Sequence, residues 1–313
     1  MSSSASSSTA PTPGESAREK PRFPISSIPP NPLGEGRHIR TAAALIIGDE
    51  ILNGKTLDRN SHFFAQYCFE QGIELKRVEV IADDEEEIIE ASRRMVKNYD
   101  FVITTGGIGP THDAKSFNQN LAHHGETLRR MEALGKQRTF SNPGQLEAAQ
   151  RMALFPERAE VIFIADNIWV PVVRLEGRLC VFPGIPSLFE RMLTSLTPFL
   201  PLPPKNERPL RIQVFTERPE SMIAPYLTAL QERLRPRGIQ VGSYPVLGKG
   251  VFVSLIGRDL AGDGENGHQL WLADVAREVE REVGGQVASE EEIAHKKEIA
   301  QKEIAAKEGK ANL

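Results

Sequence analysis

Short apolar runs and longer segments with helical spacing alternate along the chain. The apolar run at 42–47 is continuous, as in a central strand buried on both faces, and alternation over 73–81 together with an apolar start at 101–105 predicts two further strands. The segments between these runs carry apolar residues at helical spacing, and the first predicted helix ends at Gly72. This β-α-β-α-β order predicts an α/β domain with a doubly wound sheet and right-handed crossovers.

The same patterns continue as far as a proline-rich segment. Helical spacing over 121–137 and 145–154 predicts two further helices. The predicted strands that follow cover 161–164, 168–175 and 178–182. The last strand runs into a turn at 183–186 and then a helix, and this turn is a candidate for a second wall of a binding pocket, although a purely structural turn explains its composition equally well.

A change of composition divides the chain into domains. Five prolines between residues 198 and 209 indicate a stiff linker. The segments beyond it predict a small α+β domain, with strands at 211–216, 239–246 and 251–257 and helices at 222–234 and 270–283. Serine and proline dominate the first 39 residues, which we predict to be a disordered tail. We therefore predict a disordered tail at 1–39, folded domains at 40–200 and 210–288, and a charged tail at 289–313.

Composition narrows the class of protein. The 313 residues are 40% hydrophobic and carry a net charge of −4, which does not favour nucleic acid as a partner. Two cysteines, Cys68 and Cys180, lie in apolar runs, so we expect buried, reduced thiols and a reducing, cytoplasmic location. No apolar run reaches the ~18 to 20 residues that span a bilayer, so we expect no membrane partner.

The stretch from Thr104 to Asp113 carries the strongest candidate chemistry. Its glycines follow a predicted buried strand, where backbone N–H groups can approach a phosphate closely. Thr104, Thr105 and Thr111 add hydroxyl groups near the same place. The alternative is a strand-to-helix turn without a ligand.

Polar residues also follow the first two predicted strands. Asp49 and Asp83 lie at their carboxyl ends, which is the edge where ligands bind in open α/β sheets. For Asp83 the alternative is an N-cap, as it is for Asp58 or Asn60 at the preceding helix. The adjacent His123 and His124 point in different directions on the predicted helix, which argues against a metal pair there.

Together these motifs resemble a known family. The segments Gly48–Gly54, Asp58–Asn60, Ile81–Asp84, Gly106–Asp113 and Pro183–Pro186 resemble the molybdopterin-binding (MoaB/Mog-like) fold, most closely the N-terminal domain of the CinA family and of eukaryotic FAD synthases. The likeness covers residues 40 to about 200, and the later domain resembles the KH-like domain of CinA proteins. The resemblance implies a three-layer Mog-like α/β domain with a mostly parallel sheet, followed by a small α+β KH-like domain.

The order of domains is similar to that of fungal FAD pyrophosphatases, which implies cleavage of FAD to FMN and AMP. The implied cofactors are a divalent cation (Co²⁺, Mg²⁺ or Mn²⁺) and K⁺. Asp83 and Asp113 match the acids that face metal and substrate in this family. Asp49, at the end of the first predicted strand, is expected to face the same crevice as a third carboxylate for the metal. The implied substrate-binding residues are Asn53, Gly54, Asn60, Thr104, Thr105, Gly106, Gly107, Gly109, Pro110, Thr111, Pro183 and Gly184.

Two departures from the family pattern leave other functions open. A second aspartate usually follows the position of Asp113, but Ala114 to Phe117 stand there, and 165–169 replace a Gly-Thr-Ala-Pro-Gly-type segment. The alternatives are a non-catalytic module that binds molybdopterin or a nucleotide, and a molybdopterin adenylyltransferase. The small-molecule partner is accordingly FAD or molybdopterin, and a homo-oligomer is compatible with the sequence.

Overall fold

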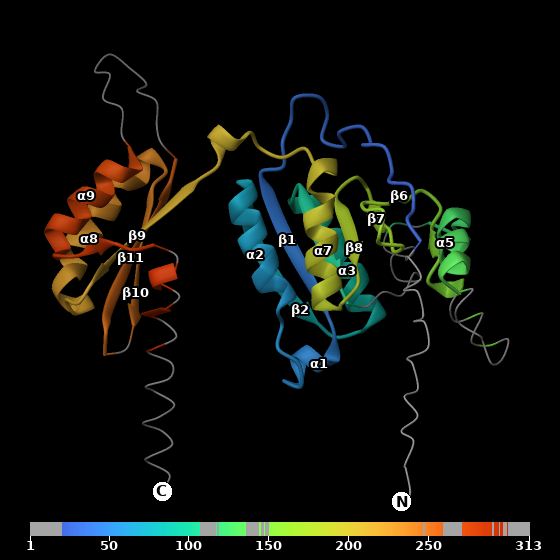
Figure 1. Cartoon of the computed structure of the whole chain (residues 1–313), viewed down its shortest axis with the longest axis horizontal. Helices are drawn as coiled ribbons and strands as arrows, with labels where there is room; N and C mark the ends of the chain where they lie inside the picture. Colours follow the sequence, from blue (N-terminus) through green and yellow to red (C-terminus); the bar gives the residue numbers. More distant parts are fainter. Residues whose placement is uncertain are drawn as a thin grey trace, which may run out of the picture. The chain divides into compact units, whose positions relative to one another are not determined.

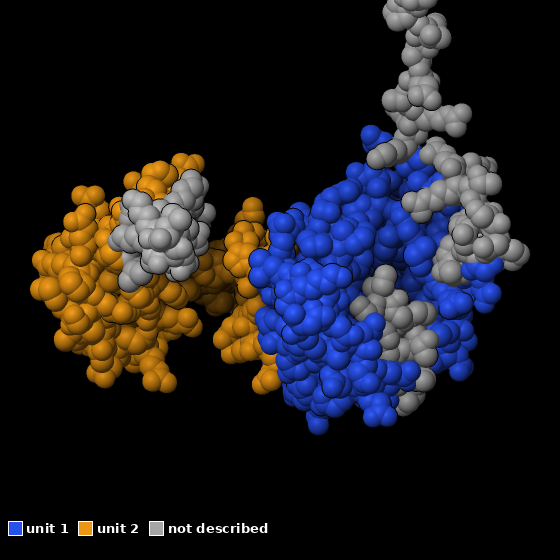
Figure 2. All heavy atoms as spheres, turned by 90° about the horizontal axis from the view of Figure 1, so that it is seen from below, with its two compact units in different colours: residues 1–35, 43–61, 78–200 blue, residues 36–42, 62–77, 201–313 orange. Residues whose placement is uncertain are grey.

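A computed structural model describes most of the chain. The described residues are 21–106, 117, 119–135, 144, 147, 150–246, 248–258, 271–289, 291–293, 295, 296 and 299. The chain divides into two compact units (Figure 2), one formed by Met1–Glu35, Ala43–Ser61 and Val78–Leu200 and the other by Gly36–Ala42, His62–Arg77 and Pro201–Leu313. The domain boundaries inferred from the sequence stay predictions.

The larger sheet has six strands in the order β2-β1-β3-β8-β7-β6 (Figure 1). The strands are β1 Thr41–Ile47, β2 Glu74–Ile81, β3 Phe101–Thr105, β6 Glu160–Ile162, β7 Val172–Leu175 and β8 Leu179–Phe182. β3 pairs with β8 in parallel, whereas β7 runs antiparallel to both β8 and β6. The prediction of an α/β domain with a mostly parallel sheet is confirmed.

The core lies on both sides of this sheet. All five residues of β3 and six of the seven in β1 are buried, which requires cover on both faces. On one face, Ile88, Ala91 and Met95 of α3 (Glu85–Asn98) belong to the same cluster as Ala43 and Leu45 of β1. Phe182 of β8 meets Phe189 of α7 (Pro186–Leu196) edge to face, with ring centroids 5.3 Å apart.

Two short local features follow the ends of β1 and β2. The one-turn helix α1 (Asp49–Leu52) comes directly after β1 and Gly48. Asp84, not Asp83, is the N-cap of α3, because its Oδ1 accepts 3.0 Å hydrogen bonds from the N–H groups of Glu86 and Glu87. The capping alternative for Asp83 is therefore wrong. The prediction that Gly72 follows α2 (Asn60–Gln71) is confirmed, since Gly72 has φ +75°.

The predicted helix over 121–137 is wrong at its start. Leu121–His123 is a strand, β4, that pairs antiparallel with β5 (Leu154–Pro156), and α5 covers only Gly125–Gly135. Backbone hydrogen bonds to a distant segment override the helical spacing here. His123 therefore lies in a strand, not on a helix.

His124 lies between β4 and α5. Its Nδ1 lies 2.9 Å from the hydroxyl of Thr127 and 3.3 Å from the N–H of the same residue, so the imidazole caps the helix. The predicted helix over 145–154 falls mostly outside the described residues, but its last residue, Leu154, belongs to β5.

The N-terminal segment from residue 21 is bonded to the rest of the first unit, whereas the sequence predicts a disordered tail through residue 39. Phe23 and Ser26 donate backbone hydrogen bonds of 2.8 Å to the carbonyl groups of Asp166 and Phe163. The carbonyl of Pro24 accepts 2.6 Å from Nη2 of the buried Arg130. The composition of this segment predicts disorder, but its backbone hydrogen bonds and the contact with Arg130 keep it in place.

The second unit contains an antiparallel sheet of four strands in the order β10-β11-β9-β12. Its elements are β9 Leu210–Thr216, α8 Glu220–Leu234, β10 Gln240–Val246, β11 Gly250–Gly257, α9 Leu272–Val283 and β12 Gln286–Val287. Apolar residues of both helices and of β9 to β11 form one core cluster. The predicted α+β class is confirmed, with β12 as an added strand. Short 3₁₀ helices cover Thr197–Phe199, Lys205–Glu207 and Arg235–Arg237.

The helices that the structure describes do not meet the requirements for a membrane span. None of them combines the length and the apolar character needed to cross a bilayer. Most of the predicted charged tail at 289–313 lies outside the described residues.

Candidate functional site

The carboxyl ends of four strands meet at one edge of the larger sheet. Just after β1, the N–H of Gly48 donates 3.1 Å to the carbonyl of Ile81, the last residue of β2. Just after β3, Gly106 has φ +87°, and a Cβ on it would lie 1.9 Å from the carbonyl oxygen of Ile47. A Cβ on Gly184, after β8, would lie 3.3 Å from the Cα of Gly106. At Gly106 only glycine allows this approach of the backbones, and a side chain at Gly184 would be tightly packed. This edge of the sheet is the one where ligands bind in open α/β folds.

A buried polar network joins the same strand ends. Nδ2 of Asn60, at the start of α2, donates to Oγ1 of Thr105 (2.8 Å) and to the carbonyl of Gly184 (3.1 Å). The hydroxyl of Thr105 in turn donates to the carbonyl of Pro183 (3.2 Å). Asn60 is 6% exposed, and its Oδ1 is buried without a hydrogen-bond partner among the described residues. The network thus presents one unused acceptor at this edge.

The two threonines of β3 are both buried, and Thr105 takes part in the polar network. Thr104 is 2% and Thr105 1% exposed. Thr105 has one hydroxyl proton, and the carbonyl of Pro183 accepts it, so this hydroxyl has no proton left for a phosphate. Thr105 instead fixes the turn after β8 against the end of β3.

Carboxylates gather after β1 and β2. Asp49 and Asp83 are both exposed, and the hydrogen bond from Gly48 to Ile81 brings their main chains together. The carboxylate of Glu50 folds back over Gly48, since a Cβ placed there would lie 2.7 Å from Oε1 of Glu50. The sequence places Glu50 beside Asp49 at the end of this strand, but no role at the site was predicted for Glu50.

The oxygen chemistry of these carboxylates suits Mg²⁺, Mn²⁺ or Co²⁺. The described residues nevertheless contain no group of three or more His, Cys, Asp or Glu side chains arranged to hold a metal ion. Asp113, the third predicted ligand, lies outside the described residues. Asp49 and Asp83 are therefore compatible with a divalent cation but do not complete its ligand set.

The other predicted binding residues fall into two groups. Asn53 caps the end of α1, where its Oδ1 accepts 3.0 Å from the N–H of Lys55, and Gly54 follows with φ +76° and open space around it. Both form a local exposed turn and take no part in the buried network. The remaining predicted residues lie outside the described part of the chain: Gly107, Gly109, Pro110 and Thr111.

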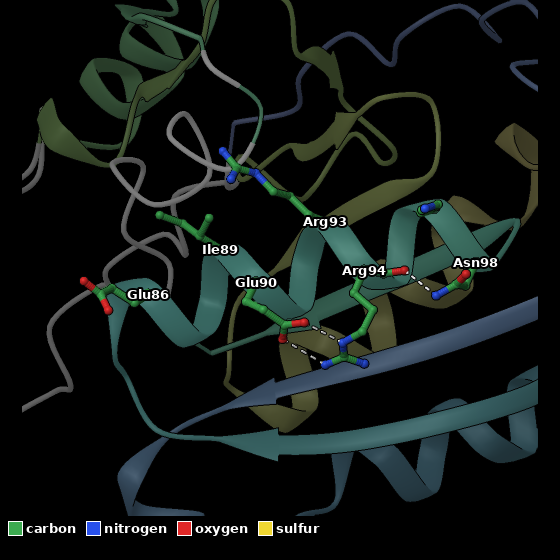
Figure 3. Close-up of a pocket in the computed structure, with 7 residues that line it drawn as sticks. Glu86, Ile89, Glu90, Arg93, Arg94 and Asn98 are labelled. Carbon is green, nitrogen blue, oxygen red and sulfur yellow. Dashed lines mark hydrogen bonds and ion pairs between the residues drawn. The ribbon is translucent and has the colours of Figure 1, made fainter.

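A groove of about 630 Å³ runs along the outer face of α3 but contains none of the predicted site residues (Figure 3). Arg94 points toward Glu90 there, with Nε 2.8 Å from Oε1, and it also pairs with both carboxylate oxygens of Glu79 at 2.8 Å. The hydrogen bond from Arg94 lowers the pKa of Glu90 below its ordinary range. These groups form an ion-pair network that joins α3 to Glu79 of β2.

Known proteins are similar to this chain. It is 32% identical over 232 residues to a protein of Caenorhabditis elegans named "Probable FAD synthase", which covers 66% of this chain and 44% of the relative. It is 30% identical over 231 residues to Protein PH0439 of Pyrococcus horikoshii, which covers 69% of this chain and 88% of that protein. The chain thus spans less than half of the nematode relative and most of the archaeal one.

A solved structure and a family description complete the comparison. The crystal structure of "the protein CinA with unknown function" from Thermoplasma acidophilum is 26% identical, covers 51% of this chain and 97% of its own, and has a TM-score of 0.44. The family described as "probable molybdopterin binding domain" matches residues 43–202, which include the four strand ends and the Asn60 network. The chain therefore belongs to the family of probable molybdopterin-binding domains.

Proposed function

We propose that this protein is an enzyme that hydrolyses the pyrophosphate bond of FAD to FMN and AMP with the help of a divalent cation. The observation that carries the proposal is the meeting of the ends of β1, β3 and β8 at Gly106, with the end of β2 bonded to Gly48, beside the exposed acids Asp49 and Asp83. Backbone N–H groups that no side chain covers can donate hydrogen bonds to a diphosphate. Neighbouring carboxylates can bind the cation that neutralises the charge of that diphosphate.

The roles divide between the residues of this edge. The backbone around Gly106 would bind diphosphate oxygens, and the Asn60–Thr105 network would keep that backbone against the turn after β8. Asp49, Asp83 and Asp113 would hold the cation, with Glu50 beside them. A divalent cation supplies charge neutralisation and an activated water for attack on phosphorus. Water forms the new P–O bond, the bridging P–O bond breaks, and one product is FMN and the other AMP.

Names of relatives support a flavin ligand. The Caenorhabditis elegans protein is named a probable FAD synthase, and FAD is the substrate of the proposed reaction. The relative extends well beyond the region shared with this chain, so the proposal rests on the local geometry together with the name. K⁺ remains part of the proposal as a second, monovalent cofactor.

A second candidate is a non-catalytic module that binds molybdopterin or a nucleotide. The family description names molybdopterin binding, and the chain has Ala114 where a second aspartate usually follows Asp113. Loss of one carboxylate from a metal site removes both a ligand and a positioned water. Both candidates use the same edge of the sheet but differ in turnover.

The test is to incubate the full chain with FAD and each of Mg²⁺, Mn²⁺ and Co²⁺, with and without K⁺, and to separate FMN and AMP by chromatography. We expect equal amounts of both products and none after chelation of the cation. Binding of FAD or a pterin without any product would overturn the hydrolase and favour the module.

Asp83 has a matched control in the next residue. We expect Asp83→Asn to lower kcat by at least about 100-fold, since it removes a charged ligand. Asp84→Asn should leave the rate unchanged, because asparagine is as good an N-cap as aspartate. Equal rates for the two variants would show that the acids are wrongly assigned. Asp49→Asn and Asp113→Asn extend the test to the other proposed ligands.

A further inference from the structure

An apolar pocket of about 380 Å³ opens next to the candidate site, within the first unit. Its walls come from β7 and β8, from the turn after β8 and from the segment 151–156. Phe155, Trp169, Val181 and Leu188 line it, and the rim carries two exposed apolar side chains, Ile185 at 61% and Met152 at 49%. A cavity that is lined by apolar side chains and has exposed apolar residues at its rim is typical of a ligand pocket.

The turn after β8 is shared between this pocket and the polar network. Pro183 lines the pocket, while its carbonyl accepts the hydroxyl proton of Thr105. Ile185 also lines the pocket, and the carbonyl of the preceding Gly184 accepts from Asn60. Residues 183–185 therefore form the wall between an apolar pocket on one side and the meeting strand ends on the other. A ligand with a phosphate and a ring can occupy both sides of this wall.

The lining decides which kind of ring fits. Among the described residues that line the pocket, Arg151 is the one with a charged side chain, and the others are apolar or aromatic. Adenine carries ring nitrogens and an amino group that lose hydrogen bonds in such a lining. A flavin ring has a hydrocarbon edge, the dimethylbenzene ring, that gains from burial, and its opposite carbonyl-bearing edge can face Arg151.

We propose that this pocket binds the isoalloxazine ring of a flavin nucleotide whose phosphates lie against the glycines at the strand ends. The proposal deepens the proposed function and rests on it for the position of the phosphates. The volume of about 380 Å³ is at the lower end of the ~300–1,000 Å³ of ligand pockets, which suits one ring system but not a whole dinucleotide. The ring stacks on Trp169, the largest aromatic side chain of the lining.

Two tryptophans in the chain make the test direct. Trp271 lies in the second unit, so Trp271→Phe leaves Trp169 as the single indole. In this variant we expect FMN, which has the ring and a phosphate but no pyrophosphate bond, to quench the indole fluorescence with a saturable curve. ADP-ribose, which has the pyrophosphate but no flavin, should leave the fluorescence unchanged. Absence of quenching by FMN would overturn the proposal.

Substitutions at the rim and the wall give a second readout. Trp169→Ala and Ile185→Ser should each weaken FMN binding, measured by flavin fluorescence, with the tryptophan variant losing at least about tenfold because a stacking partner is removed. Ile185 is largely exposed, so its substitution keeps the fold. Met222→Ser, at a 68% exposed apolar residue of the second unit, is the matched control and should bind FMN as the unaltered chain does.

The outcomes separate this proposal from the proposed function. Quenching by FMN without hydrolysis of FAD would support the ring pocket and overturn the hydrolase. Hydrolysis of FAD at the same KM in the unaltered chain and in Trp169→Ala would support the hydrolase and overturn the ring pocket. A change of sedimentation in Ile185→Ser without any change in FMN affinity would show that the pocket receives a second copy of the chain instead.

Discussion

Asn60 and Thr105 are hydrogen-bonded at 2.8 Å although 45 residues separate them in the sequence. The bond links the first residue of α2 to the last residue of β3, and the same two side chains bond to the carbonyls of Gly184 and Pro183 after β8. A buried asparagine that unites three segments in this way fixes how the strand ends face one another. The candidate site depends on this connection even though neither side chain needs to touch a phosphate.

We expect Asn60→Ala to lower the free energy of unfolding by about 1–3 kcal/mol, because Thr105 and Gly184 lose a buried donor. Urea unfolding followed by circular dichroism measures the change. Asn98→Ala is the control, since Asn98 also donates to a backbone carbonyl, that of Arg94, but on an exposed helix surface. A loss no larger than that of the control would contradict the role of Asn60.

Much of the larger sheet follows from the sequence because β1 is an almost continuous apolar run and β3 begins with one. The predicted limits of β3 are those observed, and β1 starts one residue earlier than predicted, at Thr41. A continuous apolar run has few alternatives to a central strand, since both of its faces must be buried. The strand β4 could not be predicted, because Leu121–His123 is too short to have a period and depends on pairing with β5.

The sequence predicts individual residues of the candidate site but not the hydrogen bonds that join them. The sequence indicates Asn60, Thr105 and Gly184 separately, whereas the hydrogen bonds between them depend on how distant segments meet. The Glu50 carboxylate lies over Gly48 because of its side-chain conformation, which the spacing of residues in the sequence does not predict. Asp113 and the metal assignment stay predictions.

A comparison of alanine substitutions at Gly106 and Gly54 distinguishes the cost of backbone strain from the cost of a steric clash. Both have positive φ, +87° and +76°, but a Cβ on Gly106 would lie 1.9 Å from the carbonyl oxygen of Ile47, while one on Gly54 meets nothing within 4 Å. We expect Gly54→Ala to cost about 1–2 kcal/mol from the left-handed conformation alone. Gly106→Ala should cost clearly more or prevent folding. Similar urea midpoints for the two variants would argue against the close approach at the strand ends.

Arg130 holds the N-terminal segment against the rest of the first unit. Its guanidinium lies 3.5 Å from the ring centroid of Phe163 and 5.0 Å from that of Phe23, and its Nε donates 2.8 Å to Glu126. Because the side chain is only 3% exposed, we expect Arg130→Met to lower the free energy of unfolding by about 2–4 kcal/mol.

The neighbouring Arg129 is the control for this prediction. It pairs with the same Glu126 but its side chain is 71% exposed, so Arg129→Met should cost less than about 1 kcal/mol. Limited proteolysis adds a second measurement, because loss of Arg130 should speed cleavage near residues 21–26. Unchanged cleavage and stability would show that the segment is held by its backbone hydrogen bonds alone.

His124 should make stability depend on pH. Burial, the largest cause, lowers the pKa of its imidazole; Glu126 opposes the shift and Arg129 and Arg130 add to it. The folded chain thus binds this proton less readily than the unfolded chain, whose histidine has a pKa near 6.5. The free energy of unfolding should be unaffected by this group above that pKa and fall as the pH drops through and below it.

Urea unfolding at several values between pH 8 and pH 5 measures this effect. In His124→Asn the fall between pH 7 and pH 5 should be smaller, because asparagine keeps a side-chain cap but binds no proton. An equal fall in both proteins would assign the pH dependence to other groups.

The two cysteines should be unreactive in the folded protein. Both are free and buried, and burial raises the pKa of the Cys180 thiol to about 12 and that of Cys68 above its ordinary range. The thiolate is the reactive form, so a disulfide reagent at pH 8 should label neither residue without denaturant and both in urea. Cys68→Ala and Cys180→Ala should each remove one equivalent of label in urea. Fast labelling of the native chain, lost in one of these variants, would show that the segment around that cysteine opens readily.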